Sequence, residues 1–341
     1  MHRRLTMSHA GLAKPLILDI PFGANPDQPD CTRTTCPHRR RPTLTQTLII
    51  PDLHADPNRL DASLRLVPRQ AQIAFLGDFI DAGKNVAHPD DGTVLHRVMA
   101  LVETGEALAV MGNHELNALL FHRADAKGRP LRQHDPKNLA QHGSFCARFG
   151  IGTPEAIAQT QWFLTLPLWQ DLGGLRLVHA CWHPSAIATI AARRPDGRLR
   201  EDDLEEIARK ETPFARAVDL LLSGPEIPLP PGISFRDNAG HCRTDVRIAW
   251  WRSGPSTWRE AALSVPDPDD LPDAPIEAND DITFYDEDQP PVLVGHYKMR
   301  GTPQIEGPAA ACLDYPDAPC VYHWNSDEPL REEGLFGPVT V

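Results

Sequence analysis

The sequence contains no run of about 18 uncharged apolar residues, so it offers no segment long enough to span a membrane. Lys14, Pro15 and Asp19 interrupt the apolar stretch near the N-terminus, which does not fit a secretory signal peptide. Seven cysteines, an odd number scattered along the chain, do not form a recognisable disulfide framework. These absences predict a cytoplasmic protein without a membrane partner.

Positive charge is also scarce, with 34 Lys and Arg against 46 Asp and Glu and a net charge of −12. Proteins that coat nucleic acid depend on Lys and Arg contacts to phosphate, so a nucleic-acid partner is disfavoured. An anionic substrate would therefore need a local positive centre, which metal ions could supply.

The chain divides into two parts by composition. Residues 1–46 are rich in Pro, Arg, Thr and Cys without periodicity, which predicts a poorly ordered N-terminal extension. From residue 47 onward, apolar runs alternate with helical patterns at about 58–66, 93–103 and 115–121. This alternation is typical of right-handed βαβ units, in which functional groups collect at the carboxyl ends of strands.

The second half predicts a more elaborate arrangement. Residues 190–222 have helical patterns, "ISFRDNAGHCRTDVRIAWW" predicts a hairpin, and the acidic residues 266–288 predict a surface loop. Strands return in "PVLVGHYK", "AACLDY" and "CVYHW". We expect one domain over residues 47–341, with a cap or insertion at about 190–290 that shapes a cleft.

Polar residues stand at the ends of five predicted strands, beginning with the stretch "LIIPDLHADP". Taken singly, such residues are more often turn formers, helix caps or hydrogen-bonded core residues. Five sets in this order on one predicted sheet edge instead indicate a shared site. They are Asp52 and His54, Asp78 and Asp81, Asn113 and His114, His179, and His296.

The residue types suit a metal centre. Carboxylate, amide and imidazole groups bind divalent ions such as Mn, Fe or Zn, and two such ions about 3.5–4 Å apart need a bridging group. Asp78 is the natural bridge. We therefore expect two divalent metal ions, with their identity open.

The order Asp-x-His, Gly-Asp-x-x-Asp, Gly-Asn-His-Glu, His and Gly-His resembles the calcineurin-like metallophosphoesterases over about residues 47–325. The "GNHE" form with a single final histidine is similar to the branch that contains phosphoprotein phosphatases and dinucleoside tetraphosphate hydrolases. The resemblance implies an α/β fold in which two mixed β-sheets pack as a sandwich flanked by helices.

The resemblance also implies a role for each residue. It assigns Asp52, His54 and Asp78 to one metal ion, and Asp78, Asn113, His179 and His296 to the other. It makes His114 a catalytic acid and Asp81 the carboxylate that orients it. Chemistry supports this independently of the resemblance. A carboxylate bonded to the ring nitrogen of His114 that faces away from the substrate would favour the imidazolium form that an acid needs.

Two departures concern phosphate binding, because the family usually has arginine at the position of Ala82 and protein phosphatases have another near Asn117. Arg243 and Arg247 are the best replacements, although each is more often expected to be a solvated surface charge. Further candidates are Arg123, Lys298 and Arg300. His183 could contact substrate or serve as a packing or capping residue.

The resemblance implies metal-dependent hydrolysis of a phosphoester. The substrate could be a phosphorylated small molecule, a phosphoprotein or a nucleotide, including a dinucleoside polyphosphate. A hypothesis from another class is a metal-binding but catalytically silent interaction module, in which Ala82 and Asn117 reflect lost phosphate handling. The sequence leaves the physiological substrate, the ion pair and the oligomeric state open.

Overall fold

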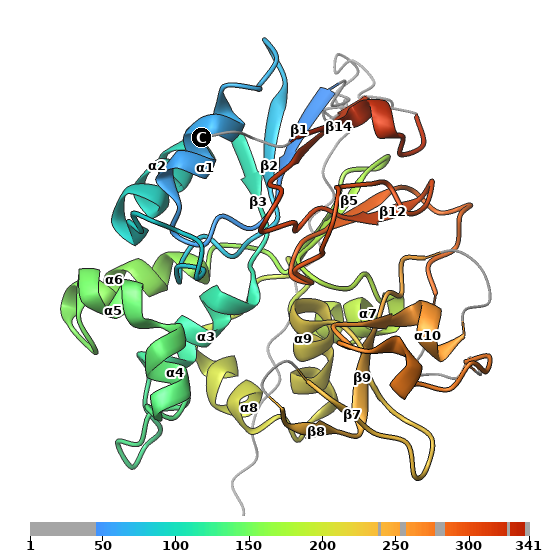
Figure 1. Ribbon diagram of the computed structural model, residues 1–341. Helices are drawn as coiled ribbons and strands as arrows, with labels where there is room; N and C mark the ends of the chain where they lie inside the picture. The colour runs from blue at the N-terminus through green and yellow to red at the C-terminus, as the bar shows by residue number, and fades with distance from the viewer. Residues whose placement is uncertain (1–45, 238–239, 253–256, 277–283, 326–327, 338–341) are drawn as a thin grey trace, which may run out of the picture. The chain divides into compact units, whose positions relative to one another are not determined.

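The structure is a computed structural model that describes residues 46–237, 240–252, 257–276, 284–325 and 328–337. The predicted extension over residues 1–46 lies outside the described residues except for Gln46. Two larger sheets form the centre of the unit Thr43–Val341 (Figure 1). Both sheets are mixed, with three parallel strands that extend to one edge and antiparallel pairing toward the other edge.

The first sheet has the order β14-β13-β1-β2-β3, and β1, β2 and β3 run parallel. Its strands are β14 (Leu335–Phe336), β13 (Val321–Asn325), β1 (Gln46–Ile50), β2 (Gln72–Phe75) and β3 (Ala107–Ala109). The second sheet has the order β12-β11-β5-β4, and β12, β11 and β5 run parallel. Its strands are β12 (Ala310–Cys312), β11 (Val292–Val294), β5 (Arg176–Val178) and β4 (Trp169–Asp171).

The two sheets pack face to face through alternate side chains of their strands. Ile49 of β1 and Ala74 of β2 belong to the same buried cluster as Leu177 of β5 and Leu293 of β11. Their sequence neighbours point the other way and join a cluster with the helices, as Leu48 does. The predicted sandwich of two mixed sheets flanked by helices is therefore confirmed.

Helices cover the outer face of each sheet, and the predicted helices after the first three strands are confirmed within about two residues. Most of the helices begin at a side-chain cap. At the start of α1, for example, the carboxylate of Asp56 accepts the N–H groups of Asn58 and Arg59. The helices are α1 (Pro57–Leu64), α2 (Asp91–Glu103), α3 (Asn113–Phe121), α4 (Pro136–Gln141), α5 (Gly143–Phe149), α6 (Pro154–Phe163), α7 (Pro184–Arg193), α8 (Leu204–Arg209), α9 (Pro213–Ser223) and α10 (Trp258–Ala261). Short 3-10 turns are η1 (Glu201–Asp203), η2 (Pro268–Asp270) and η3 (Glu332–Gly334).

The described residues between α9 and β11 form a smaller lobe with its own apolar cluster, which includes Ile227, Val246 and Leu271. A sheet of order β10-β9-β6 and the hairpin β7-β8 build it. The strands are β6 (Glu226–Pro228), β7 (Phe235–Arg236), β8 (Cys242–Arg243), β9 (Asp245–Ile248) and β10 (Ala262–Leu263). The predicted hairpin is present only as the short pair β7-β8, because β9 pairs with β6 and β10 instead. No helix of the described residues is long and apolar enough to cross a membrane.

Candidate metal centre and phosphoesterase site

The predicted site residues follow the carboxyl ends of parallel strands in two sheets, whereas the sequence predicted one sheet edge. Asp52 and His54 follow β1, Asp78 and Asp81 follow β2, and Asn113 and His114 begin α3 after β3. His179 follows β5 and His296 follows β11. Because the sheets pack together with these ends on one side, the structure brings all eight residues into one region, connected by the contacts described next.

The side chains meet around Asp78 and Asn113. Oδ1 of Asn113 lies 2.9 Å from Nε2 of His179 and 2.8 Å from Nδ1 of His296. Oδ1 of Asp78 lies 3.5 Å from Nε2 of His179. Two groups of three possible ligand atoms, each within 4.8 Å of one another, share Asp78: one with His54 and His114, the other with Asp52 and His179.

Backbone strain is concentrated at these strand ends. His54, Asp78, Asp81 and His296 all have positive φ values, of 47°, 51°, 66° and 74°. Residues with a Cβ rarely adopt this conformation, and it occurs mostly where surrounding structure enforces it at functional sites. The strain turns each side chain sharply out of its strand direction.

Glycines allow the ligand loops to approach one another closely. A Cβ on Gly77 would lie 2.5 Å from the backbone nitrogen of Gly112, and one on Gly295 would collide with the carboxylate of Asp52. A side chain at either position would block this close approach, so glycine is required there.

The electrostatics of the cluster suit cations. Burial, reinforced by the nearby carboxylates of Asp314 and Asp78, raises the pKa of Asp52 well above its usual value. Burial, with His114 next in effect, lowers the pKa of His54 to about 3. Arg59 is the one buried Lys or Arg side chain among the described residues, against several buried carboxylates. Divalent ions would offset this excess of negative charge.

His114 and Asp81 form a buried pair, with Nδ1 of His114 2.7 Å from Oδ2 of Asp81. Burial opposes the charged imidazolium, but Asp78 and Asp81 outweigh this effect and raise the pKa of His114 to about 9. The other ring nitrogen, Nε2, lies 3.8 Å from Oδ2 of Asp78. His114 can therefore hold a proton that faces the ligand cluster.

Glu115 and Asp314 were missed by the sequence reasoning. The carboxylate of Glu115 accepts N–H groups from Asp78, Phe79 and Gly112 at 2.8–2.9 Å, which joins the loops after β2 and β3. Asp314 follows β12 and is fully buried, and its Oδ2 accepts the N–H of Lys298. Its position after an apolar strand, as for Asp52, was the signal available.

The predicted phosphate-binding residues lie at different distances from the ligand cluster. Arg247 lies close enough to His296 for its charge to contribute to lowering the pKa of that histidine, after burial and His179. Arg243 is exposed and pairs with Asp237 at 2.7 Å, so the structure does not bring it to the ligand cluster. His183 caps α7 by accepting the N–H of Ala186, which agrees with the capping alternative.

Arg132 was not identified from the sequence, and it lies beside Asn117. Its Nη1 donates to Oδ1 of Asn117 at 2.6 Å, and its Nη2 donates to Oε1 of Gln141 at 2.8 Å. Gln141 in turn places its amide nitrogen 3.4 Å from Nε2 of His114. The side-chain amide of Gln141 therefore connects the guanidinium of Arg132, in the loop before α4, to the ring of His114.

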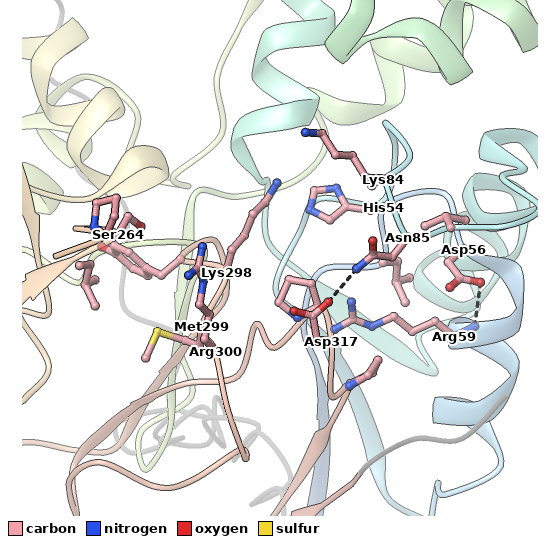
Figure 2. A pocket seen from close by; sticks show the side chains of 18 of the residues that line it. His54, Asp56, Arg59, Lys84, Asn85, Ser264, Lys298, Met299, Arg300 and Asp317 are labelled. Atoms are coloured by element: carbon pink, nitrogen blue, oxygen red, sulfur yellow. Dashed lines mark hydrogen bonds between the residues drawn. The ribbon is translucent and has the colours of Figure 1, made fainter. Parts of the chain in front are cut away.

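A cavity of about 750 Å³ opens next to His54. Basic side chains on its wall include Lys84, Lys298 and Arg300, and none of the three has an acidic partner within 4.0 Å among the described residues. In the view of Figure 2, His54 lies between Lys84 and Lys298. Residues 262–266 of the smaller lobe also line this cavity.

The sequence is similar to those of known proteins over part of its length. A protein from Ralstonia nicotianae described as a symmetrical bis(5'-nucleosyl)-tetraphosphatase is 32% identical over 132 residues, which cover 38% of this chain and 40% of that protein. The match therefore spans well under two thirds of that relative.

Solved structures also show likeness at low identity. A cold-active protein-tyrosine phosphatase of a psychrophilic Shewanella is 12% identical with a TM-score of 0.46, over 84% of this chain and 77% of that one. A serine/threonine phosphatase from Saccharomyces cerevisiae is 12% identical with a TM-score of 0.44, over 88% and 80%.

The sequence model that describes calcineurin-like phosphoesterases matches residues 45–322, which include every strand-end residue of the site. The chain therefore belongs to the calcineurin-like phosphoesterase family.

Proposed function

We propose that this protein hydrolyses phosphoesters at a centre of two divalent metal ions. The observation that carries the proposal is the convergence of Asp52, His54, Asp78, Asn113, His179 and His296 from two sheets. Nε2 of His54 and Nε2 of His296 are buried and have no hydrogen-bond partner among the described residues. Buried imidazole nitrogens without partners, next to buried carboxylates, are the donor set that divalent ions fit.

The ligands would be Asp52, His54, Asp78, Asn113, His179 and His296, with Asp78 shared between the ions. When bound, such ions lower the pKa of nearby water and neutralise charge on phosphoryl oxygens. His114 would donate the proton on Nε2 to the leaving oxygen, while Asp81 holds Nδ1–H and fixes the ring. The identity of the ions as Mn, Fe or Zn and the cytoplasmic location stay predictions.

The cavity would hold the rest of the substrate. Lys84, Lys298 and Arg300 supply positive charge beside His54, and this supports a substrate with more than one anionic group. Arg132 would take over part of the role expected of arginine at Ala82 or Asn117, because it lies next to Asn117 and Gln141. Phosphorylated small molecules, nucleotides and phosphoproteins all fit this requirement.

Hydrolysis of dinucleoside polyphosphates is a second candidate. The size of the cavity, the positive charge of Lys84, Lys298 and Arg300 on its wall and the description of the Ralstonia relative favour it. The catalytically silent interaction module is the candidate of another class, and the intact His114–Asp81 pair disfavours it.

The test is a metal analysis of the purified protein, followed by turnover of para-nitrophenyl phosphate, phosphopeptides and diadenosine tetraphosphate. We expect close to two ions per chain and turnover of at least one substrate. Preference for diadenosine tetraphosphate would select the second candidate. Metal-loaded protein that turns over none of the panel but binds a protein partner would instead support the interaction module.

A further inference from the structure

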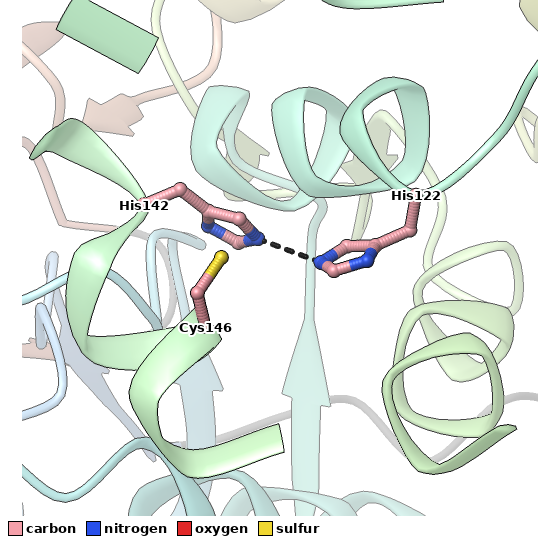
Figure 3. A group of neighbouring side chains, drawn as sticks. All are labelled: His122, His142 and Cys146. Carbon is pink, nitrogen blue, oxygen red and sulfur yellow. Dashed lines mark hydrogen bonds between the residues drawn. The ribbon is translucent and has the colours of Figure 1, made fainter. Parts of the chain in front are cut away.

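A row of buried hydrogen bonds continues from Asp81 away from the proposed metal centre. Oδ1 of Asp81 lies 2.6 Å from Nδ1 of His142, and Nε2 of His142 lies 3.0 Å from Nε2 of His122. Nδ1 of His122 accepts the backbone N–H of Gly152 at 3.1 Å. We name His122, His142, Asp81 and His114 the histidine chain. His122 and His142, with the nearby Cys146, are drawn in Figure 3.

The backbone of Gly152 determines where each proton of the chain lies. A backbone N–H can only donate, so Nδ1 of His122 must accept and the neutral ring carries its proton on Nε2. Because Nε2 of His122 donates, Nε2 of His142 must accept, and the proton of the His142 ring is therefore on Nδ1. His142 therefore donates to Oδ1 of Asp81, and Oδ2 is left to face Nδ1 of His114.

Packing holds the two additional rings in place. The ring of His142 stacks on Phe145, with centroids 4.6 Å apart and planes at 16°, and His122 lies at a tilted angle to the same phenyl ring. Both histidines are at most 7% exposed. The backbone N–H of Asp81 also donates to Asp91 at 2.9 Å, so main chain and side chain are both fixed.

We propose that His142, supported by His122, is a positioning residue that acts through Asp81 to orient His114 for proton donation. This inference rests on the proposed function, because it assumes that His114 is the proton donor of the reaction. It adds that His142 and His122, which lie outside the metal centre, hold the carboxylate of Asp81 in place. No proton needs to move along the chain. The N–H of His142 holds one carboxylate oxygen so that the other stays aligned with His114.

A third metal site is the competing explanation, because His122, His142 and Cys146 place one ligand atom each within 4.8 Å of one another. Binding through Nε2 of His122 would put the ring proton on Nδ1, directly against the N–H of Gly152. Two donors would then face each other at 3.1 Å. Burial also raises the pKa of Cys146 to about 11, which opposes the thiolate that a metal requires.

The test compares His142→Phe, which keeps the stacked ring, with His142→Asn, which restores an N–H near the position of Nδ1. Substrates are phenyl phosphate, a poor leaving group, and 2,4-dinitrophenyl phosphate, a good one. We expect His142→Phe to lower kcat by about 10–100-fold on phenyl phosphate and far less on the dinitrophenyl ester. His142→Asn should recover most of the loss, with metal content unchanged in both variants.

Equal losses on both substrates would overturn the proposal, because a purely structural defect does not distinguish leaving groups. Cys146→Ala is the matched control and should leave kcat and metal content unchanged; loss of one ion per chain would establish the third metal site instead. Long-range ¹H–¹⁵N NMR of the wild-type protein gives a reading independent of activity. It should find the Nε2–H form of His122 and the Nδ1–H form of His142, and the opposite forms would overturn the proposal even if the enzyme proved inactive.

Discussion

Oδ1 of Asp78 lies 3.5 Å from Nε2 of His179, although the two residues follow strands of different sheets. Its other oxygen, Oδ2, lies 3.8 Å from Nε2 of His114 on a neighbouring helix. The two oxygens of one carboxylate therefore face groups from both halves of the sandwich. This central position supports the proposal that Asp78 is the ligand shared between the two ions.

We therefore expect Asp78→Asn to reduce occupancy of both metal ions, because an amide offers one oxygen and no negative charge. Elemental analysis after dialysis against a weak chelator measures the effect. His179→Ala is the comparison, and it should lower occupancy of mainly one ion. Loss of a single ion from Asp78→Asn would mean that this carboxylate does not bridge.

Replacement of His114 tests its role as the acid. His114→Ala should keep its metal but lose about 10²–10⁴-fold in kcat on substrates with poor leaving groups, and much less on those with good ones. The exposed His88 offers a control, and His88→Ala should leave both rates unchanged. An equal loss for all leaving groups would contradict an acid role.

Glu115 should be important for stability as well as for the site. In Glu115→Gln, only one oxygen remains for the three backbone N–H groups of Asp78, Phe79 and Gly112, and the amide group would face donors. We expect the free energy of unfolding to fall by about 2 kcal/mol and metal affinity to fall with it. Chemical denaturation measures the change, with Glu103→Gln on the exposed face of α2 as the control. A stability equal to that of the wild type would show that these contacts are dispensable.

Sequence reasoning could propose the metal ligands because each stands shortly after an apolar strand, where the geometry of a parallel sheet determines the position. The same reasoning missed Asp314, since "AACLDY" was interpreted only as a strand. Arg132 and His142 could not be found in this way. They lie in the segment between α3 and α5, whose path depends on packing against Phe145 and on capping at Asp135. Arg243 was proposed from the sequence as a phosphate-binding residue, but in the structure it pairs with Asp237 in the hairpin.

Arg132 should contribute to substrate binding. Arg132→Ala removes the guanidinium that bonds Asn117 and Gln141, so we expect KM for a phosphomonoester to rise by about tenfold, the loss of one charge-assisted hydrogen bond. Arg129→Ala is a matched control from the same loop, because Arg129 is exposed and pairs with Asp125. An unchanged KM for Arg132→Ala would assign Arg132 a structural role only.

His122 gives the protein a specific dependence on pH. Burial, with the neighbouring ring of His142 next in effect, lowers the pKa of His122 from 6.5 to about 4. In the unfolded chain His122 therefore binds a proton below about pH 6.5, whereas in the folded protein it binds one only below about pH 4. The stabilising contribution of His122 is present above pH 6.5 and is lost as the pH falls toward 4. Relative to His122→Phe, the wild type should lose stability by roughly 1.4 kcal/mol per pH unit across this window. Urea denaturation of both proteins at pH 7, 6 and 5 measures the difference, and a gap that stays constant with pH would mean that folding does not lower the pKa of His122.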